Sequence, residues 1–145
     1  IESYKVYEDD DVIAALDIKP ANAGHVLVIP KNHVQYSTEL DDAGGLFNIA
    51  NKIAKRIFET LHRDTNIFVA NGKNAGQRAG HLIVHVIPRE EDDGVHFEWN
   101  GREVDREKLE ALREQLFFKD EARFEDAEKM MVREEEEHEE AIRIP

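Results

Sequence analysis

The stretch His-Leu-Ile-Val-His-Val-Ile at residues 81–87 combines β-prone side chains with two histidines. Side chains alternate between the two faces of a strand, so His81, Ile83 and His85 point the same way and the residues between them point oppositely. Two imidazoles therefore flank an isoleucine on one face. Such a pair can bind a phosphate, share a proton or ligate a metal, because imidazole changes charge near neutral pH. A purely structural role is the commoner reason for a histidine pair of this kind.

The loop before this strand is rich in residues that suit a tight, polar turn. It reads Asn71-Gly72-Lys73-Asn74-Ala75-Gly76-Gln77. Its two glycines permit tight backbone turns, and its three amide side chains offer neutral hydrogen-bond donors. Such a loop can hold an oxyanion close to the strand. An ordinary solvated connection explains the same residues equally well.

Further strands and one long helix are predicted before these two segments. Residues 5–8, 12–17 and 25–30 read as short strands that indicate an antiparallel meander, and residues 66–70 read as another strand. Apolar side chains recur at helical spacing from residue 42 to residue 62, which predicts an amphipathic helix. Its apolar face consists of Leu46, Ile49, Ala50, Ile53, Ala54, Ile57 and Leu61.

The last third of the chain has a different character. Asp105 can cap a second helix with an apolar stripe made of Leu109, Leu112 and Leu116. Trp99 is expected to anchor the chain after the core. Beyond Lys119 we expect a helical segment whose apolar contacts are Ala122, Ala127 and Met130 or Met131. The sequence therefore predicts a core over residues 1–98 and an acidic, helical C-terminal extension over residues 99–145.

Length and charge narrow the class of protein and of partner. The 145 residues suffice for one hydrophobic core with an appended segment. The net charge of −13 repels the backbone of nucleic acids, so we expect no nucleic acid partner. A small phosphate compound can still bind a local site of amides and histidines. No apolar run approaches the ~20 residues that span a bilayer, so we expect a soluble protein with no membrane partner.

Two further expectations come from what the sequence lacks. Without Cys, these residues can form neither a disulfide nor a Cys-based metal site, which favours the cytoplasm. The sequence begins at Ile1, with neither an initiating Met nor the pattern of a signal peptide. We therefore expect a fragment that lacks its natural first residues.

One known family shows the same residue types in the same order. The matching positions fall between about Tyr4 and Arg89 and are Asp17, Gly24, His25, Ile29-Pro30-Lys31, His33, Asn71-Gly72, Ala75-Gly76-Gln77, His81, His85 and Ile87-Pro88-Arg89. On these residues the chain resembles the histidine triad (HIT) family. The family motif reads His-φ-His-φ-His-φ-φ, in which φ is apolar, and Ile83 stands here where the middle histidine belongs.

The resemblance implies a fold, a ligand and a partner. The fold is α+β, with a five-stranded antiparallel sheet, a long central helix, a second helix and the acidic C-terminal extension. Family members act as hydrolases or nucleotidyl transferases on nucleoside phosphates, phosphoramidates or dinucleoside polyphosphates. The implied ligand is a purine nucleotide or a nucleoside monophosphate conjugate. The implied partner is a second copy of the chain, because members commonly form homodimers by pairing a helix and a strand across a two-fold axis.

The resemblance also assigns catalytic positions. In the family the middle histidine attacks the α-phosphorus and forms a nucleotidyl-imidazole that water later hydrolyses. Ile83 has no lone pair, so we expect this covalent route to be impaired. His81 and His85 remain as catalytic histidines, and His25 supports them through hydrogen bonding. Attack by water, with His81 or His85 as acid or base, stays open as an alternative.

The ligand-binding positions are matched one by one. Asp17 resembles the residue that hydrogen-bonds the ribose hydroxyls, and Asn71, Gln77 and His85 resemble the groups that contact the phosphate. Arg78 departs from the family, because many members carry there a hydroxyl side chain that serves the leaving group. The apolar side chains expected around the base are Val6, Ile13, Leu16, Val26 and Phe47.

A metal site and two non-enzymatic roles complete the hypotheses. In zinc-containing branches of the family, the positions of His33 and His81 join an upstream Cys-x-x-Cys pair. Those cysteines would precede Ile1, so we expect no metal and no other cofactor in this chain. The protein could also bind nucleotides without catalysis, or serve only as a dimeric interaction protein.

Overall fold

The computed structural model describes residues 3–142, apart from the side chains of residues 121–128. The chain divides into two compact units, one up to Phe97 and one from Glu98 onward. The first unit contains all five strands and the long helix, and the second contains two further helices.

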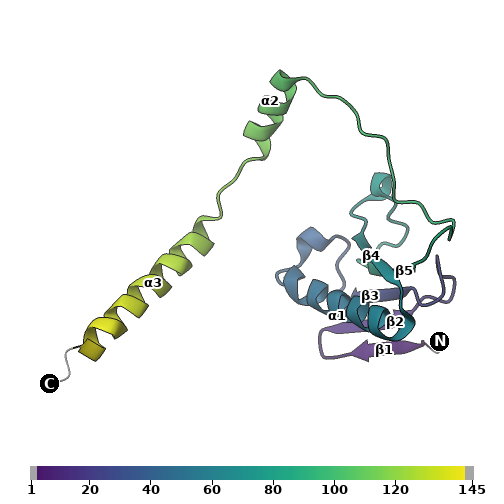
Figure 1. Cartoon of the computed structure of the whole chain (residues 1–145), viewed down its shortest axis with the longest axis horizontal. Helices are drawn as coiled ribbons and strands as arrows, with labels where there is room; N and C mark the ends of the chain where they lie inside the picture. The colour runs from purple at the N-terminus through teal and green to yellow at the C-terminus, as the bar shows by residue number, and fades with distance from the viewer. Residues whose placement is uncertain (1–2, 143–145) are drawn as a thin grey trace. The chain divides into compact units, whose positions relative to one another are not determined.

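The first unit is built on a five-stranded antiparallel sheet with one long helix against it (Figure 1). Its strands are β1 (Lys5–Glu8), β2 (Val12–Leu16), β3 (Val26–Pro30), β4 (Asp64–Val69) and β5 (Val84–Arg89). Their order in the sheet is β1-β2-β3-β5-β4, with every neighbouring pair antiparallel. The predicted sheet and the meander of its first three strands are confirmed.

The predicted long helix is confirmed as α1 (Ala43–Leu61). Asp42 caps its N-terminus, where Oδ1 accepts a 2.9 Å hydrogen bond from the backbone N–H of Gly45. His62 ends the helix in the left-handed region, with φ of 56°. The core between α1 and the sheet consists of Leu46, Ile49, Ala50, Ile57, Val12, Ala14, Val26, Val28, Leu82, Val84 and Val86.

The last strand is shorter than predicted, since β5 begins at Val84 and not at His81. Val28 of β3 pairs with Val84. Two residues further along β3, Pro30 has no N–H with which to extend the ladder toward Leu82. Leu82 instead donates its backbone N–H to the carbonyl of Val34 over 2.8 Å.

The predicted alternation of faces continues through the residues that precede β5. Leu82, Val84 and Val86 are fully buried, with exposed fractions of 0%, whereas His81 and His85 are only partly buried. The buried side chains face α1 in the core. Because alternate residues of an extended chain point oppositely, the histidines lie on the other face of the sheet.

The second unit contains α2 (Arg106–Leu116) and α3 (Glu121–Ile142). As predicted, Asp105 caps α2 and accepts a 2.8 Å hydrogen bond from the backbone N–H of Lys108. The acidic extension is helical in α3. Among residues 3–142, no helix combines the length and the apolar character needed to cross a membrane.

Several apolar side chains of this second unit are exposed. Trp99 is 86% exposed, so the prediction that it is a buried anchor is wrong. The segment around it has no regular secondary structure. The stripe on α2 is exposed, as are Met130 and Met131. The contacts predicted for Ala122 and Ala127 lie outside the described residues.

Candidate functional site

A cavity of about 470 Å³ opens on the face of the sheet opposite α1. His81, Ile83 and His85 line it from the β5 side, and Asp17 and His25 line it from the ends of β2 and β3. The alternation of side chains along the 81–87 segment and the turn between β2 and β3 therefore bring these five predicted positions together. This cavity is the candidate site.

Two histidines at the site are joined by a hydrogen bond that defines their tautomers. The backbone N–H of Ala21 donates to Nδ1 of His25 over 3.1 Å, so this nitrogen carries no proton. Nε2 of His25 then carries the proton and donates to Nδ1 of His85 over 3.0 Å. The remaining proton of a neutral His85 must lie on Nε2, which makes no hydrogen bond with any other described residue. His85 thus offers one N–H donor to a ligand.

Burial keeps both rings neutral. Burial lowers the pKa of His25, and the nearby Asp17 carboxylate opposes that shift only in part. Burial also lowers the pKa of His85, with a further lowering from His25 and an opposing effect of Asp17. The pair therefore favours the uncharged state near neutral pH, which agrees with the directions of the hydrogen bonds.

Aromatic contacts hold the His85 ring from its other side. Phe68 of β4 is paired with His85 in the sheet, and the two rings stack with centroids 4.5 Å apart and planes 7° apart. Phe97 packs against Phe68 with centroids 5.3 Å apart. The imidazole is thus fixed by one hydrogen bond and by one stacked ring.

Ile83 lines the cavity between His81 and His85. Its hydrocarbon side chain can neither attack an electrophile nor exchange a proton. His81 donates from Nδ1 to the carbonyl of Leu82 over 2.9 Å. Its ring also lies at 72° to the ring of His33, with centroids 4.9 Å apart. Within the described part of the chain, no group of three His, Cys, Asp or Glu side chains could hold a metal ion.

Asp17 lies directly after β2 and takes part in the turn to β3. Its Oδ1 accepts a 2.9 Å hydrogen bond from the backbone N–H of Lys19, and its Oδ2 lies 3.8 Å from Nδ1 of His25. The carboxylate therefore has a turn role and also lines the cavity. Among the described residues that line the cavity, Lys19 and Arg78 carry positive charge.

The amides of the polar loop bind a neighbouring segment of the chain. Asn71 accepts from the N–H of Ser37 over 2.9 Å and donates to its hydroxyl over 2.8 Å. Gln77 accepts from the N–H of Gly72 over 2.8 Å and donates to the carbonyl of Gln35 over 2.7 Å. Of the two, only Gln77 is among the described residues that line the cavity. The phosphate contacts expected of both amides stay predictions.

The apolar residues expected around the base lie outside the lining of this cavity. None of the five lines the cavity among the described residues, and three of them, Val6, Leu16 and Val26, line a separate hollow beside α1. Leu16 and Val26 are paired across β2 and β3 and therefore share that face. The apolar wall of the cavity includes Ile87 of the 81–87 stretch and four residues that sequence patterns did not single out, which are Phe68, Ala70, Val95 and Phe97.

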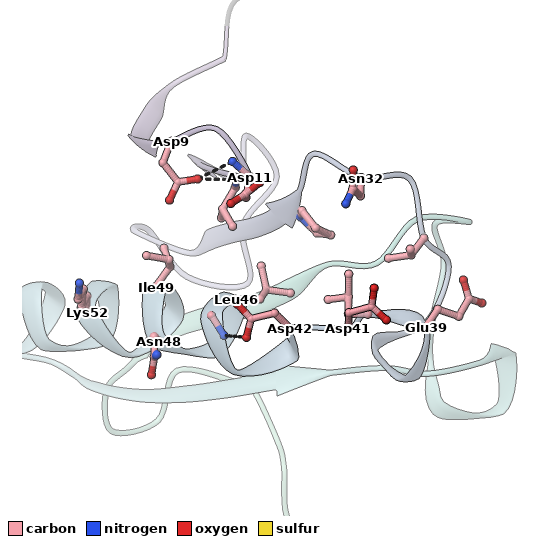
Figure 2. A pocket seen from close by; sticks show the side chains of 15 residues that line it. Asp9, Asp11, Asn32, Glu39, Asp41, Asp42, Leu46, Asn48, Ile49 and Lys52 are labelled. Carbon is pink, nitrogen blue, oxygen red and sulfur yellow. Dashed lines mark hydrogen bonds between the residues drawn. The ribbon is translucent and has the colours of Figure 1, made fainter. Parts of the chain in front are cut away.

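Another hollow, beside the N-terminus of α1, has a different chemistry (Figure 2). Its volume is about 550 Å³, and carboxylates are prominent around it. Asp9 accepts hydrogen bonds from the backbone of Asp11 and Val12, and Asp42 caps α1 (Figure 2). These two carboxylates stabilise a turn and a helix end. The cavity with the coupled histidines is the better candidate for an anionic ligand.

Comparison with known proteins gives a family match for the first unit. The model of the HIT domain matches residues 1–92. An uncharacterized HIT-like protein of Borreliella burgdorferi is 41% identical, over 80% of this chain and 88% of its own length. An adenosine 5'-monophosphoramidase of Saccharomyces cerevisiae is 37% identical, over 82% of this chain and 75% of its own.

A solved structure gives the same result for the fold. The crystal structure of a member of the HIT family from Bacillus subtilis aligns with a TM-score of 0.75 and 36% identity. The alignment covers 80% of this chain and 86% of the Bacillus subtilis chain.

The lowered pKa values of His25 and His85 predict a loss of stability in acid. Between these values and the ordinary histidine pKa of about 6.5, the unfolded chain binds more protons than the folded unit. The stabilising contribution should be fully present above about pH 6.5 and be lost as the pH falls through the lowered values. Urea unfolding at about pH 7.5 and about pH 5 measures this, and His25→Gln and His85→Gln should each reduce the loss. An equal loss in the parent and in both variants would contradict the prediction.

Proposed function

Because this chain belongs to the HIT domain family, we propose that it binds a purine nucleotide or a nucleoside monophosphate conjugate at the His25–His85 cavity with impaired covalent catalysis. The observation that carries this proposal is the position of Ile83. It lines the cavity between His81 and His85, where the family's nucleophile would stand. His25, His81 and His85 line the same cavity, which supports the proposal.

The polar groups of the cavity suit the phosphate and the ribose. Nε2–H of the neutral His85 can donate to a phosphate oxygen, and Lys19 and Arg78 supply positive charge at the same cavity. Asp17 can accept from ribose hydroxyls. Asn71 and Gln77 support the phosphate end by holding their loop, and contact of their amides with the ligand is part of the proposal.

The apolar wall and the volume suit a purine. Phe68 and Phe97 offer aromatic surface, and Val95 adds aliphatic surface beside them. A volume of about 470 Å³ falls within the range of small-molecule pockets. The adenosine 5'-monophosphoramidase relative is consistent with an adenine nucleotide as the first ligand to test.

Titration calorimetry with AMP and with GMP tests the binding. We expect a dissociation constant below about 1 mM for at least one of them. His85→Ala should weaken binding by at least about tenfold. It removes the N–H donor that faces the ligand, and it leaves the Phe68 ring without its stacking partner. Asn48→Ala, at the other hollow, serves as the control and should bind as the parent does. A folded parent protein that binds neither nucleotide at millimolar concentration would refute the proposal.

Ile83→His tests the impaired catalysis. The substitution returns a nucleophilic nitrogen to the centre of the cavity, so hydrolysis of an adenosine phosphoramidate should rise by at least about a thousandfold. Ile83→Leu is the control and should leave the rate at the level of the parent. If the parent hydrolyses the compound as fast as Ile83→His does, catalysis does not need the missing histidine.

We also propose that the protein is a homodimer. β4 lies at the edge of the sheet, so one of its sides is unpaired within the described unit. Phe58 and Leu61, near the C-terminal end of α1, are 64% and 46% exposed. An edge strand and an apolar helix surface together suit a two-fold interface. Sedimentation at micromolar concentration should give twice the chain mass of 16.7 kDa, and a monomer would count against the dimer.

A further inference from the structure

One buried carboxylate lies just behind the candidate site. Asp93 follows β5 by four residues, and its side chain is only 5% exposed. Oδ2 accepts from Nδ2 of Asn22 over 2.9 Å, from Nε of Arg89 over 2.8 Å and from the N–H of Glu90 over 3.1 Å. Oδ1 accepts from Nη2 of Arg89 over 3.1 Å and from the N–H of Val95 over 3.0 Å. Five hydrogen bonds therefore converge on this one side chain.

The bond to Asn22 links Asp93 to the segment between β2 and β3. Asn22 also donates to the carbonyl of Pro88, and its own carbonyl accepts from the N–H of His25. The neighbouring N–H of Ala21 donates to Nδ1 of His25, and this bond selects the tautomer of both coupled histidines. Asp93 thus helps to hold the backbone that sets where the protons of the site lie.

The bonds to Arg89 and Val95 link Asp93 to the apolar wall. Nη2 of Arg89 donates to the carbonyl of Val95 over 2.5 Å, and its guanidinium lies 5.4 Å from the centre of the Phe97 ring. Val95 and Phe97 line the cavity, and Phe97 packs on Phe68, the ring that stacks on His85. The course of the chain from Asp93 to Phe97 therefore shapes the aromatic side of the cavity.

We propose that Asp93 is a positioning residue, which holds the segment from Asp17 to His25 and the segment from Asp93 to Phe97 as two walls of one ligand cavity. The proposal rests on the proposed nucleotide binding for the identity of the ligand. Asp93 touches no ligand itself, because Asn22, Arg89 and the two backbone N–H groups occupy both of its oxygens.

The charge of Asp93 is needed for this arrangement. The Arg89 guanidinium beside it holds the pKa of the carboxyl far below its usual range, so Asp93 is ionised near neutral pH. An asparagine has one acceptor oxygen and one donor nitrogen. In either orientation its NH2 group would face at least two of the N–H donors that now converge on the carboxylate. Asp93→Asn therefore loosens both walls while it changes few atoms.

Asp93→Asn and Asp9→Asn form a matched pair of variants. Asp9 is also a carboxylate with several hydrogen bonds. It accepts from the hydroxyl of Tyr7 and from two backbone N–H groups of its turn, but it does not line the cavity. Calorimetry with AMP, at a temperature where both variants are folded, should show about tenfold or greater weakening for Asp93→Asn. Asp9→Asn should stay within about twofold of the parent. Equal affinities in the two variants would overturn the proposal.

A readout without ligand separates this inference from the proposed function. Nitrogen-15 NMR of the imidazoles should show single Nε2–H tautomers for His25 and His85 in the parent and in Asp9→Asn. In Asp93→Asn the His25 signals should move toward a mixture of tautomers, because the hydrogen bond from Ala21 is weakened. Unchanged tautomers in Asp93→Asn would contradict the positioning role, even if the parent binds no AMP.

A second variant covers the case in which Asp93→Asn does not fold. Asn22→Ala keeps the pair of Arg89 and Asp93 and removes the two side-chain hydrogen bonds of Asn22, to Asp93 and to the carbonyl of Pro88. It should change the His25 tautomer and weaken AMP binding in the same direction as Asp93→Asn. Parent-like tautomers in a folded Asn22→Ala would overturn the proposal on their own.

Discussion

The burial of one side of β5, together with that of Leu82 two residues before it, is the constraint on which the fold and the site both depend. Leu82, Val84 and Val86 are fully buried in the core under α1. A chain that buries every second residue presents the residues between them to the other face. A shift of register by one residue would put His85 into the apolar core, where its polar atoms would need new partners. The cavity therefore has its histidines because apolar side chains are buried on the far side of the same strand.

The site that results is neutral at its centre. Burial favours the uncharged forms of His25 and His85, and their hydrogen bonds leave one N–H on His85 for a ligand. Such a donor stabilises an oxyanion without being titrated itself. Ile83 adds apolar surface beside it and no lone pair. The proposed binding of a phosphate without covalent attack rests on this arrangement.

Most elements of the first unit could be predicted from local patterns, because each pattern lies within the element. The cap at Asp42 and the end at His62 bound α1 as expected, since both depend on residues one or two turns away. The apolar wall could not be predicted in this way. Phe68 meets His85 only through the register of β4 on β5, and Phe97 reaches Phe68 only because Asp93 and Arg89 direct the chain there. Leu16 and Val26 line the hollow beside α1 and not this cavity, because order along the chain does not tell which face of the sheet a side chain occupies.

By itself, the sequence determined the strands and helices, the common face of His81, Ile83 and His85, and the absence of a nucleophile at the middle position. Each of these depends on residue type and on neighbours a few positions away. Only the tertiary structure decided which imidazole nitrogens carry protons and which side chains wall the cavity. The physical reason is the range of the contacts: His25 meets His85 across 60 residues and Asn22 meets Asp93 across 71, so packing, and no local pattern, brings them together.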